Sequence, residues 1–174
     1  MHTYTKKDQT AIFEAVKFCA LAMDHGKDSR FDLDVLRLEE GKIVGCDGHR
    51  LHIAEVDHGL EPGAYEVIEN KAGQVRIIRK ATAGEYPDYT SIVAHCNGNH
   101  VRFLPFVSSK EAYQPYTEVV RAMAPEITLR FKYVQDAVSA AGHSFAVHGS
   151  GPVALKSGAG NFQAYIMPAA MGKY

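Results

Sequence analysis

Histidine is the residue type that most readily does chemistry in this sequence, with nine copies among 174 residues. Seven of them are candidate metal ligands: His49, His52, His58, His95, His100, His143 and His148. His49 and His52 are three residues apart on an expected strand, which points their side chains to opposite faces. Cys96 and His100 have a usable ligand spacing, but no second ligand pair accompanies them. A metal-dependent enzyme that uses histidines is therefore an alternative hypothesis.

Other catalytic patterns are missing from the sequence. It contains no Gly-x-Ser-x-Gly, no phosphate-binding loop and no His-Glu-x-x-His. The glycine-rich segments 149–151 and 158–160 lie between expected short strands, so hairpin turns explain them better than nucleotide binding. Asp47, His49 and Asp57 could do acid–base chemistry, but no local pattern supports that role. We therefore expect a protein that is not an enzyme and binds no metal or other cofactor.

The composition is that of a globular protein. The sequence is 46% apolar and 22% charged, and its formal net charge is −1. This balance argues against a protein coated in positive charge to bind DNA, but it allows a local basic lining. No apolar run approaches the roughly 18 residues of a membrane span, and the N-terminus lacks the pattern of a signal peptide. Three widely spaced cysteines favour a reducing cytoplasm over a disulfide framework.

The N-terminal part predicts a helix followed by three strands. Apolar residues recur at three- and four-residue steps over about 8–23, as on one face of a helix that Thr5 or Asp8 could cap and His25-Gly26 could end. The expected strands are 31–35, 43–46 and 51–56, with a turn at 39–42 and a further short strand at 1–4. Asp47-Gly48 joins the last two strands, because this dipeptide strongly favours a hairpin turn.

The C-terminal part repeats this order. Residues 127–131 alternate as a strand, and residues 133–141 have helical spacing that stops at Gly142. Three short strands separated by glycine-rich turns are expected at 144–148, 153–157 and 162–167. Two copies of strand, helix and three strands indicate an internal duplication.

Residues 64–125 between the two copies are less regular. Their patterns predict strands at 65–68, 74–80 and 100–107, a turn at 85–89, and a helix at 110–123 that Pro115 interrupts. No segment is linker-like or low in complexity.

The string Cys46-Asp47-Gly48-His49-Arg50-Leu51 has a plain interpretation as a tight hairpin with polar residues at its tip. Following a helix and two strands, it also resembles the sequence at the same place in the middle domain of the bacterial DNA polymerase III beta subunit, the DNA sliding clamp. Three further segments resemble that family in the same order along the chain: 9–56, 85–89 and 127–171. The four matches cover more than half of the chain.

The resemblance implies a hydrophobic cleft that binds short peptide motifs from polymerases, the clamp loader and repair proteins. Carried over residue by residue, this cleft comprises Gly48, His49, Arg50, Leu51, Tyr165, Ile166, Met167 and Pro168. Two departures, Cys46 in place of Thr and Ala169-Ala170 in place of Met-Arg, would make the cleft shallower or change its peptide preference. In the family the two halves come from neighbouring domains, so here an interface between subunits is one place where they could meet. For Met167-Pro168, the alternative is a strand end stopped by proline.

The resemblance also implies helices that line a ring and attract DNA phosphates loosely, without sequence preference. The candidate DNA-binding residues are Lys6, Lys7 and Lys17 near the first expected helix and Lys132 near the last. Asp136 lies on the same short helix as Lys132 and offsets its charge. Ordinary solvated lysines are the alternative explanation for this small set.

The fold implied is α+β of the DNA-clamp type, in which duplicated strand-helix-three-strand units pack their helices on one side of antiparallel sheets. Bacterial clamp subunits carry three domains each and pair into a six-domain ring, whereas this chain has room for about one domain plus an insertion. We expect a single clamp-like domain over 1–174, with repeat one at about 1–80, an insert at about 81–125 and repeat two at about 126–174. Two compressed domains that meet near Tyr89 are the alternative.

The expected function is a sliding-clamp-like replication scaffold. It would assemble on or near duplex DNA as a homo-oligomer, through head-to-tail contacts that close, and recruit replication or repair proteins that carry clamp-binding peptides. An alternative within the same fold is a protein-interaction module that captures peptides without encircling DNA.

Overall fold

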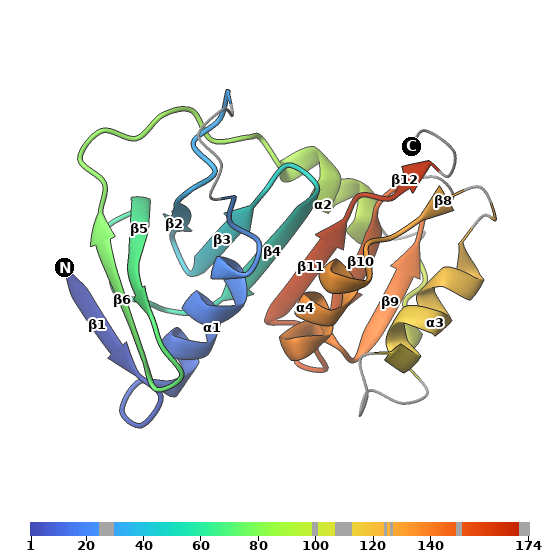
Figure 1. Cartoon of the computed structure of the whole chain (residues 1–174), viewed down its shortest axis with the longest axis horizontal. Coiled ribbons are helices and arrows are strands. Elements are labelled where there is room, and N and C mark those ends of the chain that lie inside the picture. The colour runs from blue at the N-terminus through green and yellow to red at the C-terminus, as the bar shows by residue number, and fades with distance from the viewer. Residues whose placement is uncertain are drawn as a thin grey trace. The chain divides into compact units, whose positions relative to one another are not determined.

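The periodic segments of the sequence fold into helices and antiparallel strands, which the computed structural model describes for residues 1–24, 30–98, 101–106, 113–123, 125, 127–148 and 151–170 (Figure 1). The chain divides into two compact units, unit 1 at Met1–Pro87 and unit 2 at Asp88–Tyr174. The boundary between them falls within residues 85–89, the segment expected to be a turn.

Unit 1 consists of an antiparallel sheet and helix α1 (Figure 1). Its elements are β1 (His2–Thr5), α1 (Thr10–Ala20), β2 (Leu36–Glu39), β3 (Lys42–Cys46), β4 (Arg50–Glu55), β5 (Gly63–Asn70) and β6 (Gln74–Arg79). The strand order is β1-β6-β5-β2-β3-β4. Helix α1 contacts β1, β2, β3, β4 and β6, so it covers one face of this sheet. Its buried residues are Phe13, Ala15, Val16, Phe18 and Cys19.

Helix α1 approaches β3 very closely. A Cβ built on Gly45 would lie 2.0 Å from the carbonyl oxygen of Cys19. The thiol of Cys19 donates to the carbonyl oxygen of Ile43 over 3.2 Å. His52, which pairs with Gly45 across the ladder, is fully buried, and its ring stacks on Phe18 with 4.3 Å between centroids. Residue 45 must therefore be glycine for α1 to take this position.

Asp32 ties together two segments that flank the strands of unit 1. Its carboxylate accepts hydrogen bonds from Lys80 Nζ at 2.8 Å and from the backbone N–H of Gly84 at 2.9 Å. Its own backbone N–H donates to the carbonyl oxygen of Glu85 over 2.8 Å. Partial burial acts to raise the pKa of Asp32, but the Lys80 and Gly84 donors outweigh it and the pKa lies below its usual value. One charged residue thus joins the chain before β2 to the chain after β6.

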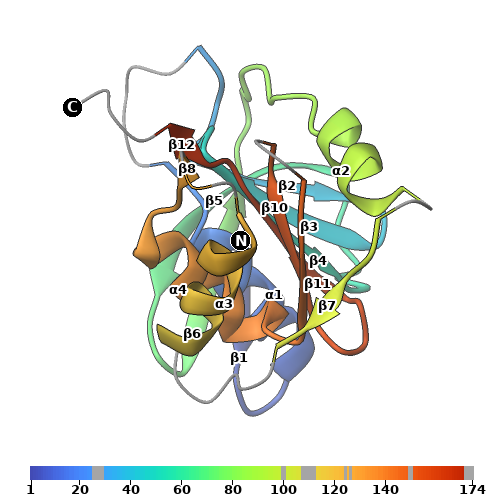
Figure 2. The same cartoon turned by 90° about the vertical axis from the view of Figure 1, so that its right-hand side faces the viewer.

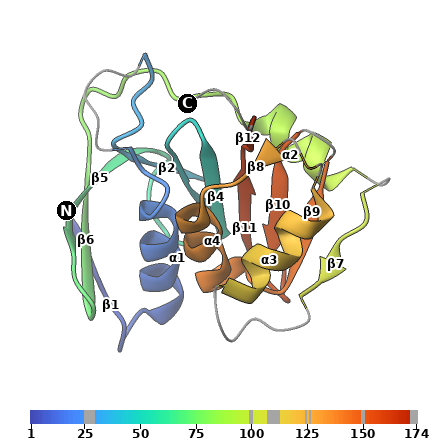
Figure 3. The same cartoon turned by 45° about the vertical axis from the view of Figure 1, so that its right-hand side comes forward.

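Unit 2 combines a sheet, a short separate ladder and helices that pack on them. Its elements are α2 (Thr90–Asn97), β7 (Leu104–Pro105), α3 (Tyr113–Ala122), β8 (Ile127–Thr128), α4 (Phe131–Ala141), β9 (Ser144–Val147), β10 (Val153–Lys156), β11 (Phe162–Ile166) and β12 (Ala169–Ala170). Within unit 2, the strand order is β11-β10-β9-β7, and β12 pairs with β8. Helix α4 packs on β10 and β11, and α3 lies beside α4 (Figures 2 and 3). None of the helices in the described ranges has the length and apolar character needed to cross a membrane.

Both units contain the strand, helix and three strands expected from the sequence. The copy in unit 1 is β1-α1-β2-β3-β4, and the copy in unit 2 is β8-α4-β9-β10-β11. In each copy, the three strands after the helix pair as antiparallel neighbours in chain order. The first strands differ, since β1 pairs with β6 and β8 pairs with β12. The expected α+β architecture with antiparallel sheets is confirmed.

Two expected elements of unit 1 were wrong at their boundaries. Residues 31–35 form no strand, because Asp32 bonds instead to the chain that follows β6. Helix α1 begins later than expected, because Thr5 Oγ1 donates to Asp8 Oδ2 at 2.7 Å in a turn that precedes the helix. Neither residue caps α1, which ends at Ala20, and the expected stop signal at 25–26 lies outside the described residues.

Three further expectations were wrong in unit 2. The strand expected at 127–131 ends at Thr128, because the next residues turn and begin α4. Pro115 does not interrupt α3, since it lies in the first turn, where a missing backbone N–H breaks no helical hydrogen bond. Of the strand expected at 100–107, the described residues contain only the two-residue β7.

Helix α2 was not expected from the sequence. Its β-branched residues have low helix propensity, which hides the helix from periodicity alone. Asp88 supplies the local signal for its start: Oδ1 accepts hydrogen bonds from the backbone N–H of Thr90 at 3.0 Å and from its hydroxyl at 2.6 Å. These two bonds hold the pKa of Asp88 below its usual value.

Residues 81–125, expected to form an insert, are divided between the units. Those after the boundary at Pro87 take part in unit 2, where β7 pairs with β9 and α3 packs on β9 and α4. Val119 and Met123 of this segment are buried. The segment therefore contributes to the core of unit 2. A single clamp-like domain over 1–174 stays a prediction.

We expect Gly45→Ala to lower the free energy of unfolding by about 2–4 kcal/mol, because the added methyl group would force α1 away from β3. Urea denaturation followed by circular dichroism measures this change. Gly73→Ala is the matched control, because a Cβ at Gly73 meets no atom within 4 Å. It should change the free energy of unfolding by less than about 0.5 kcal/mol. Equal stabilities of the two variants would contradict the close approach of α1 to β3.

We expect Asp32→Asn to lower the free energy of unfolding at pH 7 by about 1–2 kcal/mol, because charge-assisted hydrogen bonds are lost. The pKa of Asp32 is lowered by folding, so its carboxylate stabilises the protein above the usual value of 3.8. That contribution disappears as the pH falls through the folded-state pKa. The difference between variant and wild type should therefore shrink below about pH 4, as measured by denaturation at a series of pH values.

Asp34→Asn is the control for this change. Asp34 also contacts Lys80 Nζ, at 3.1 Å, but its side chain is 51% exposed. Solvent screening makes such a pair weak, so this substitution should have the smaller effect at every pH. A stability loss in Asp32→Asn that stays constant from pH 7 to pH 2 would contradict the role given to the Asp32 carboxylate.

Candidate functional site

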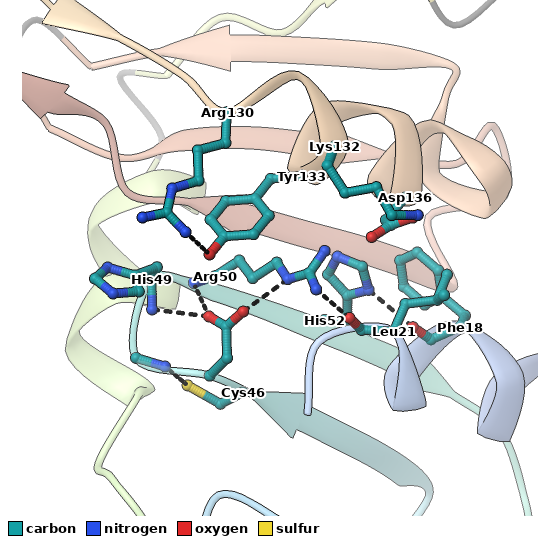
Figure 4. A network of polar contacts seen from close by, with 12 residues as sticks. Phe18, Leu21, Cys46, His49, Arg50, His52, Arg130, Lys132, Tyr133 and Asp136 are labelled. Carbon is teal, nitrogen blue, oxygen red and sulfur yellow. Dashed lines mark hydrogen bonds and ion pairs between the residues drawn. The ribbon is translucent and has the colours of Figure 1, made fainter. Parts of the chain in front are cut away.

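Asp47 shapes the turn between β3 and β4. Its Oδ1 accepts hydrogen bonds from the backbone N–H groups of His49 and Arg50, both at 2.9 Å (Figure 4). Gly48 has φ +83°, a conformation that favours glycine, and its N–H donates to Cys46 Sγ at 3.3 Å. Three residues separate β3 from β4, and the hairpin expected at Asp47-Gly48 is confirmed. The aspartate contributes as an acceptor of backbone N–H groups.

Arg50 fastens this turn to the end of α1. Its Nε donates to Asp47 Oδ2 at 2.9 Å, and its Nη2 donates to the carbonyl oxygen of Leu21, the C-cap residue of α1 (Figure 4). The last carbonyl groups of a helix carry partial negative charge, which favours a guanidinium at this place. Only 10% of the Arg50 side chain is exposed. These contacts give Arg50 a structural role, and its part in a peptide cleft stays a prediction.

The other predicted cleft residues of unit 1 differ in exposure. Gly48 and His49 are exposed at the tip of the hairpin. Leu51 is 3% exposed, so it belongs to the core rather than to the surface. The hairpin therefore presents an imidazole and backbone to solvent, with its apolar residue directed inside.

The predicted cleft residues of unit 2 divide in the same way. Tyr165 and Ile166 are buried. The Tyr165 hydroxyl donates to Gln163 Oε1 at 2.5 Å and accepts from Asn97 Nδ2 at 2.6 Å, which fixes β11 to α2. Met167 is 42% exposed and Pro168 is half-buried. Met167 is thus the residue of this group that offers apolar surface.

The start of α4 carries exposed side chains that the sequence reasoning did not select. Arg130 is exposed, its Nη1 donates to the Tyr133 hydroxyl over 3.1 Å, and its Cζ lies 5.4 Å from the Tyr133 ring centre (Figure 4). Phe131 is 41% exposed, and the edge of its ring meets Tyr116 at 5.2 Å between centroids. A run of arginine and aromatic residues at a helix start was the available signal in the sequence.

The three lysines expected to face DNA from unit 1 have different surroundings. Lys6 and Lys7 are exposed in the turn before α1, not on the helix itself. Lys17 lies on α1, where its ammonium donates to the carbonyl oxygen of Lys71 at 3.2 Å and lies 5.9 Å from the centre of the Phe13 ring. Contact between these lysines and DNA stays a prediction.

Lys132 of unit 2 forms an ion pair with Asp136 one turn later on α4, at 2.5 Å (Figure 4). Asp136 is buried, with 5% exposure, whereas the side chain of Lys132 is 65% exposed. The buried carboxylate requires a compensating charge, and Lys132 supplies one. The positive charge that Lys132 can offer to DNA is correspondingly reduced.

Four of the candidate metal-binding histidines make other contacts, namely His52, His58, His95 and His148. His52 Nδ1 lies 2.8 Å from the carbonyl oxygen of Phe18, and His58 Nε2 lies 2.8 Å from that of Glu39. The rings of His95 and His148 are tilted against each other at 5.2 Å. Across the described ranges, no three His, Cys, Asp or Glu side chains gather as a group that could hold a metal ion. His100 lies outside those ranges.

The three cysteines are free and buried. Burial raises the pKa of each thiol, and it raises that of Cys96 to about 11 against the opposing effect of Lys156. Cys46 accepts a hydrogen bond from Gly48, which partly offsets the effect of burial on its pKa. At neutral pH these groups are protonated thiols, which are poor nucleophiles. They give no support to cysteine-based catalysis.

The sequence matches no family model and no curated protein. Its structure does match solved proteins. The match to the Thermotoga maritima DNA polymerase III beta subunit covers 98% of this chain and 65% of that protein's chain, with 13% sequence identity and a TM-score of 0.61. The match to a DNA polymerase sliding clamp from Pseudomonas aeruginosa with ligand covers 98% of this chain and 66% of that protein's chain, with 11% sequence identity and a TM-score of 0.64. The match to the Helicobacter pylori beta clamp bound to DNA ligase peptide covers 92% of this chain and 63% of that protein's chain, with 13% sequence identity and a TM-score of 0.59.

This chain therefore spans about two thirds of the length of these solved clamps, 65% and 66% for the first two. The matched region of this chain includes residues of both units, because it extends over almost the entire sequence. The resemblance seen first in the Asp47–Leu51 hairpin agrees with this result. The chain has the fold of the bacterial DNA polymerase III beta subunit, the DNA sliding clamp.

Proposed function

We propose that this chain is a sliding-clamp-like scaffold that assembles on or near duplex DNA and recruits replication or repair proteins by binding their peptides. The observation that carries the proposal is the clamp fold over 98% of the chain. The Asp47–Leu51 hairpin and the Met167–Pro168 strand end add sequence features that the clamp family uses for peptide capture. A scaffold of this kind needs no catalytic residues, so we propose that the protein is not an enzyme.

Peptide capture would use the groups that the two segments expose. In unit 1 these are the His49 side chain and the backbone of Gly48, and in unit 2 they are Met167 and Pro168. A flexible thioether adapts to varied apolar side chains, and a proline limits the conformations of the strand end. Among the solved clamps, one is bound to a DNA ligase peptide and another, from Bartonella birtlesii, to griselimycin. The complex with the DNA ligase peptide supports peptide capture as the proposed activity.

The proposed assembly is based on the two compact units of the chain. Two compact units occupy the length that matches about two thirds of a solved clamp chain. Three copies of a two-unit chain would supply as many domain-sized units as the six-domain ring of the bacterial family. We therefore propose a cyclic homo-oligomer of three chains, in which the same head-to-tail contact repeats until the ring closes.

Contact with DNA would be electrostatic and weak. The exposed lysines Lys6 and Lys7 can attract phosphates without sequence preference. Lys132 contributes less, since Asp136 neutralises it, and the formal net charge of the chain is −1. These two facts favour the second candidate function, an interaction module of clamp fold that captures peptides without encircling DNA. Either function would operate in the cytoplasm, beside replicating DNA.

We expect the purified protein to have a solution mass of about 57 kDa, three times the 19.1 kDa of one chain, when measured by multi-angle light scattering. A series of protein concentrations separates a stable ring from a weak association, because a closed ring gains from every contact at once. A monomer at all concentrations would eliminate the autonomous ring and leave the interaction module.

We expect the double substitution Lys6→Ala with Lys7→Ala to weaken binding to a plain duplex by about three- to tenfold at low salt. The slope of log affinity against log salt concentration should also fall by about two. Fluorescence anisotropy with a labelled duplex measures both quantities.

Lys71→Ala is the control for the loss of a surface lysine, because Lys71 is 75% exposed and already pairs with Glu69 at 2.8 Å. It should leave the affinity unchanged. Salt-dependent binding that both variants reduce equally would remove the special role of Lys6 and Lys7. A wild-type protein with no salt-dependent binding would support the interaction module.

A further inference from the structure

The loop that joins β4 to β5 in unit 1 passes the turn between β2 and β3. The end of β4 pairs with the start of β3, and the start of β5 pairs with the end of β2, so both ends of the loop lie beside that turn. The backbone N–H of Val56 donates to the carbonyl oxygen of Gly41, in the turn, over 2.9 Å. We call residues 56–62 the crossover loop.

A single histidine is the buried residue of the crossover loop, every residue of which the structure describes. His58 is 7% exposed, whereas its neighbours Asp57 and Gly59 are exposed. The His58 Nε2 lies 2.8 Å from the carbonyl oxygen of Glu39, the last residue of β2. The His58 Nδ1 accepts a hydrogen bond from the backbone N–H of Leu60 at 3.1 Å. The ring therefore fastens the crossover loop to β2 and holds the local fold of the loop.

The two partners of the ring determine which of its nitrogens carries hydrogen. A carbonyl oxygen only accepts, so Nε2 must carry a hydrogen in order to bond to Glu39. A backbone N–H only donates, so Nδ1 must present a lone pair to Leu60. The neutral ring with its hydrogen on Nε2 meets both requirements. Protonation would place a second N–H on Nδ1, opposite the N–H of Leu60, and two donors cannot bond to each other.

The other charged groups beside the crossover loop are not of the type that titrates near neutral pH. Carboxyl, ammonium and guanidinium groups ordinarily titrate outside the range from about pH 5.5 to 7.5, whereas an imidazole ordinarily titrates within it. A second histidine, His2, lies near the loop, because its ring centre is 6.4 Å from that of Tyr65, whose hydroxyl donates to the carbonyl oxygen of Glu61. The charged residues of the loop, the β2–β3 turn and the adjoining strand ends are Glu39, Glu40, Lys42, Glu55, Asp57, Glu61 and Arg79.

We propose that His58 is a pH-sensitive switch that holds the crossover loop closed at neutral pH and releases its Leu60 end in mild acid. The neutral ring makes both hydrogen bonds. The protonated ring keeps a hydrogen on Nε2 and can still bond to Glu39, but it has lost the acceptor for Leu60. Burial acts in the same direction, because a charged ring is poorly solvated inside a protein. The stabilising contribution of the Leu60 bond is thus present at neutral pH and is lost as the pH falls.

Nuclear magnetic resonance of the ¹⁵N-labelled, full-length protein tests the switch. The ring nitrogens of His58 should show hydrogen on Nε2 and none on Nδ1 at pH 7.5. Amide hydrogen exchange at Leu60, corrected for the intrinsic effect of pH, should then lose roughly five- to tenfold of its protection at pH 5.5, the change expected for one hydrogen bond. The amides of the β3–β4 ladder are the internal reference and should keep their protection.

Variants assign the effect to the imidazole. His58→Asn removes the titrating group but keeps an acceptor, because an Asn side-chain oxygen can accept the N–H two residues later, so Leu60 should stay protected at both pH values. His58→Ala removes the acceptor, so Leu60 should be poorly protected at both. His2→Gln is the matched control, because it removes another imidazole near the loop, and it should retain the pH-dependent loss at Leu60.

Several outcomes would overturn the switch. One is a hydrogen on Nδ1 of His58 at pH 7.5, and another is equal protection of Leu60 at the two pH values in the wild-type protein. A pH-dependent loss that persists in His58→Asn would assign the effect to another group. Loss of protection in the β3–β4 ladder to the same extent as at Leu60 would indicate general unfolding. The first two measurements use only wild-type protein, so they decide the question even where a variant does not fold.

Discussion

Helix α1 can rest on β3 only because residue 45 has no Cβ, and the remaining contacts of unit 1 are arranged around that approach. The carbonyl of Cys19 occupies the space that a side chain at Gly45 would need. With the helix in that position, His52 stacks beneath Phe18, and the last turn of α1 reaches Arg50. The geometry of the hairpin tip is thus determined by a backbone contact some distance from it, since Arg50 also bonds to Asp47.

The second copy of the motif seats its helix in a related way with different residues. Ala137 and Ala141 of α4 are fully buried, so small side chains bring this helix near β10 and β11. A helix that packs at ordinary distances, as α4 does here, needs small side chains such as alanine but no glycine in the strand beneath it. Unit 2 has α2, β7 and α3 before the motif and β12 after it, whereas unit 1 adds β5 and β6 after the motif. The same supersecondary unit therefore supports two differently completed sheets.

Much of the fold could be predicted from periodicity, because apolar residues of β3, β4, α4 and β9 to β11 face a core at regular intervals. The prediction was wrong where a side chain bonds to a residue far away in the sequence and that bond determines the local backbone conformation. Asp32 alternates with apolar neighbours like a strand residue, yet its bond to Lys80, 48 positions away, removes the strand. In the candidate site, Gly48 and Met167 could be selected by resemblance. The hydrogen bond from Arg50 to the carbonyl oxygen of Leu21, 29 positions away in the sequence, depends on tertiary structure that no local pattern records.

The ion pair between Lys132 and Asp136 has a consequence for movement along DNA, if the chain forms a ring around it. A lysine that forms an ion pair with a phosphate must release it before the protein can move along the DNA, so each such ion pair adds a small barrier to one-dimensional diffusion. A lysine whose charge is already balanced within its own helix adds little to that barrier. Such a ring would diffuse along DNA over low barriers. It would stay on the DNA because the ring is closed and not because it binds the DNA tightly.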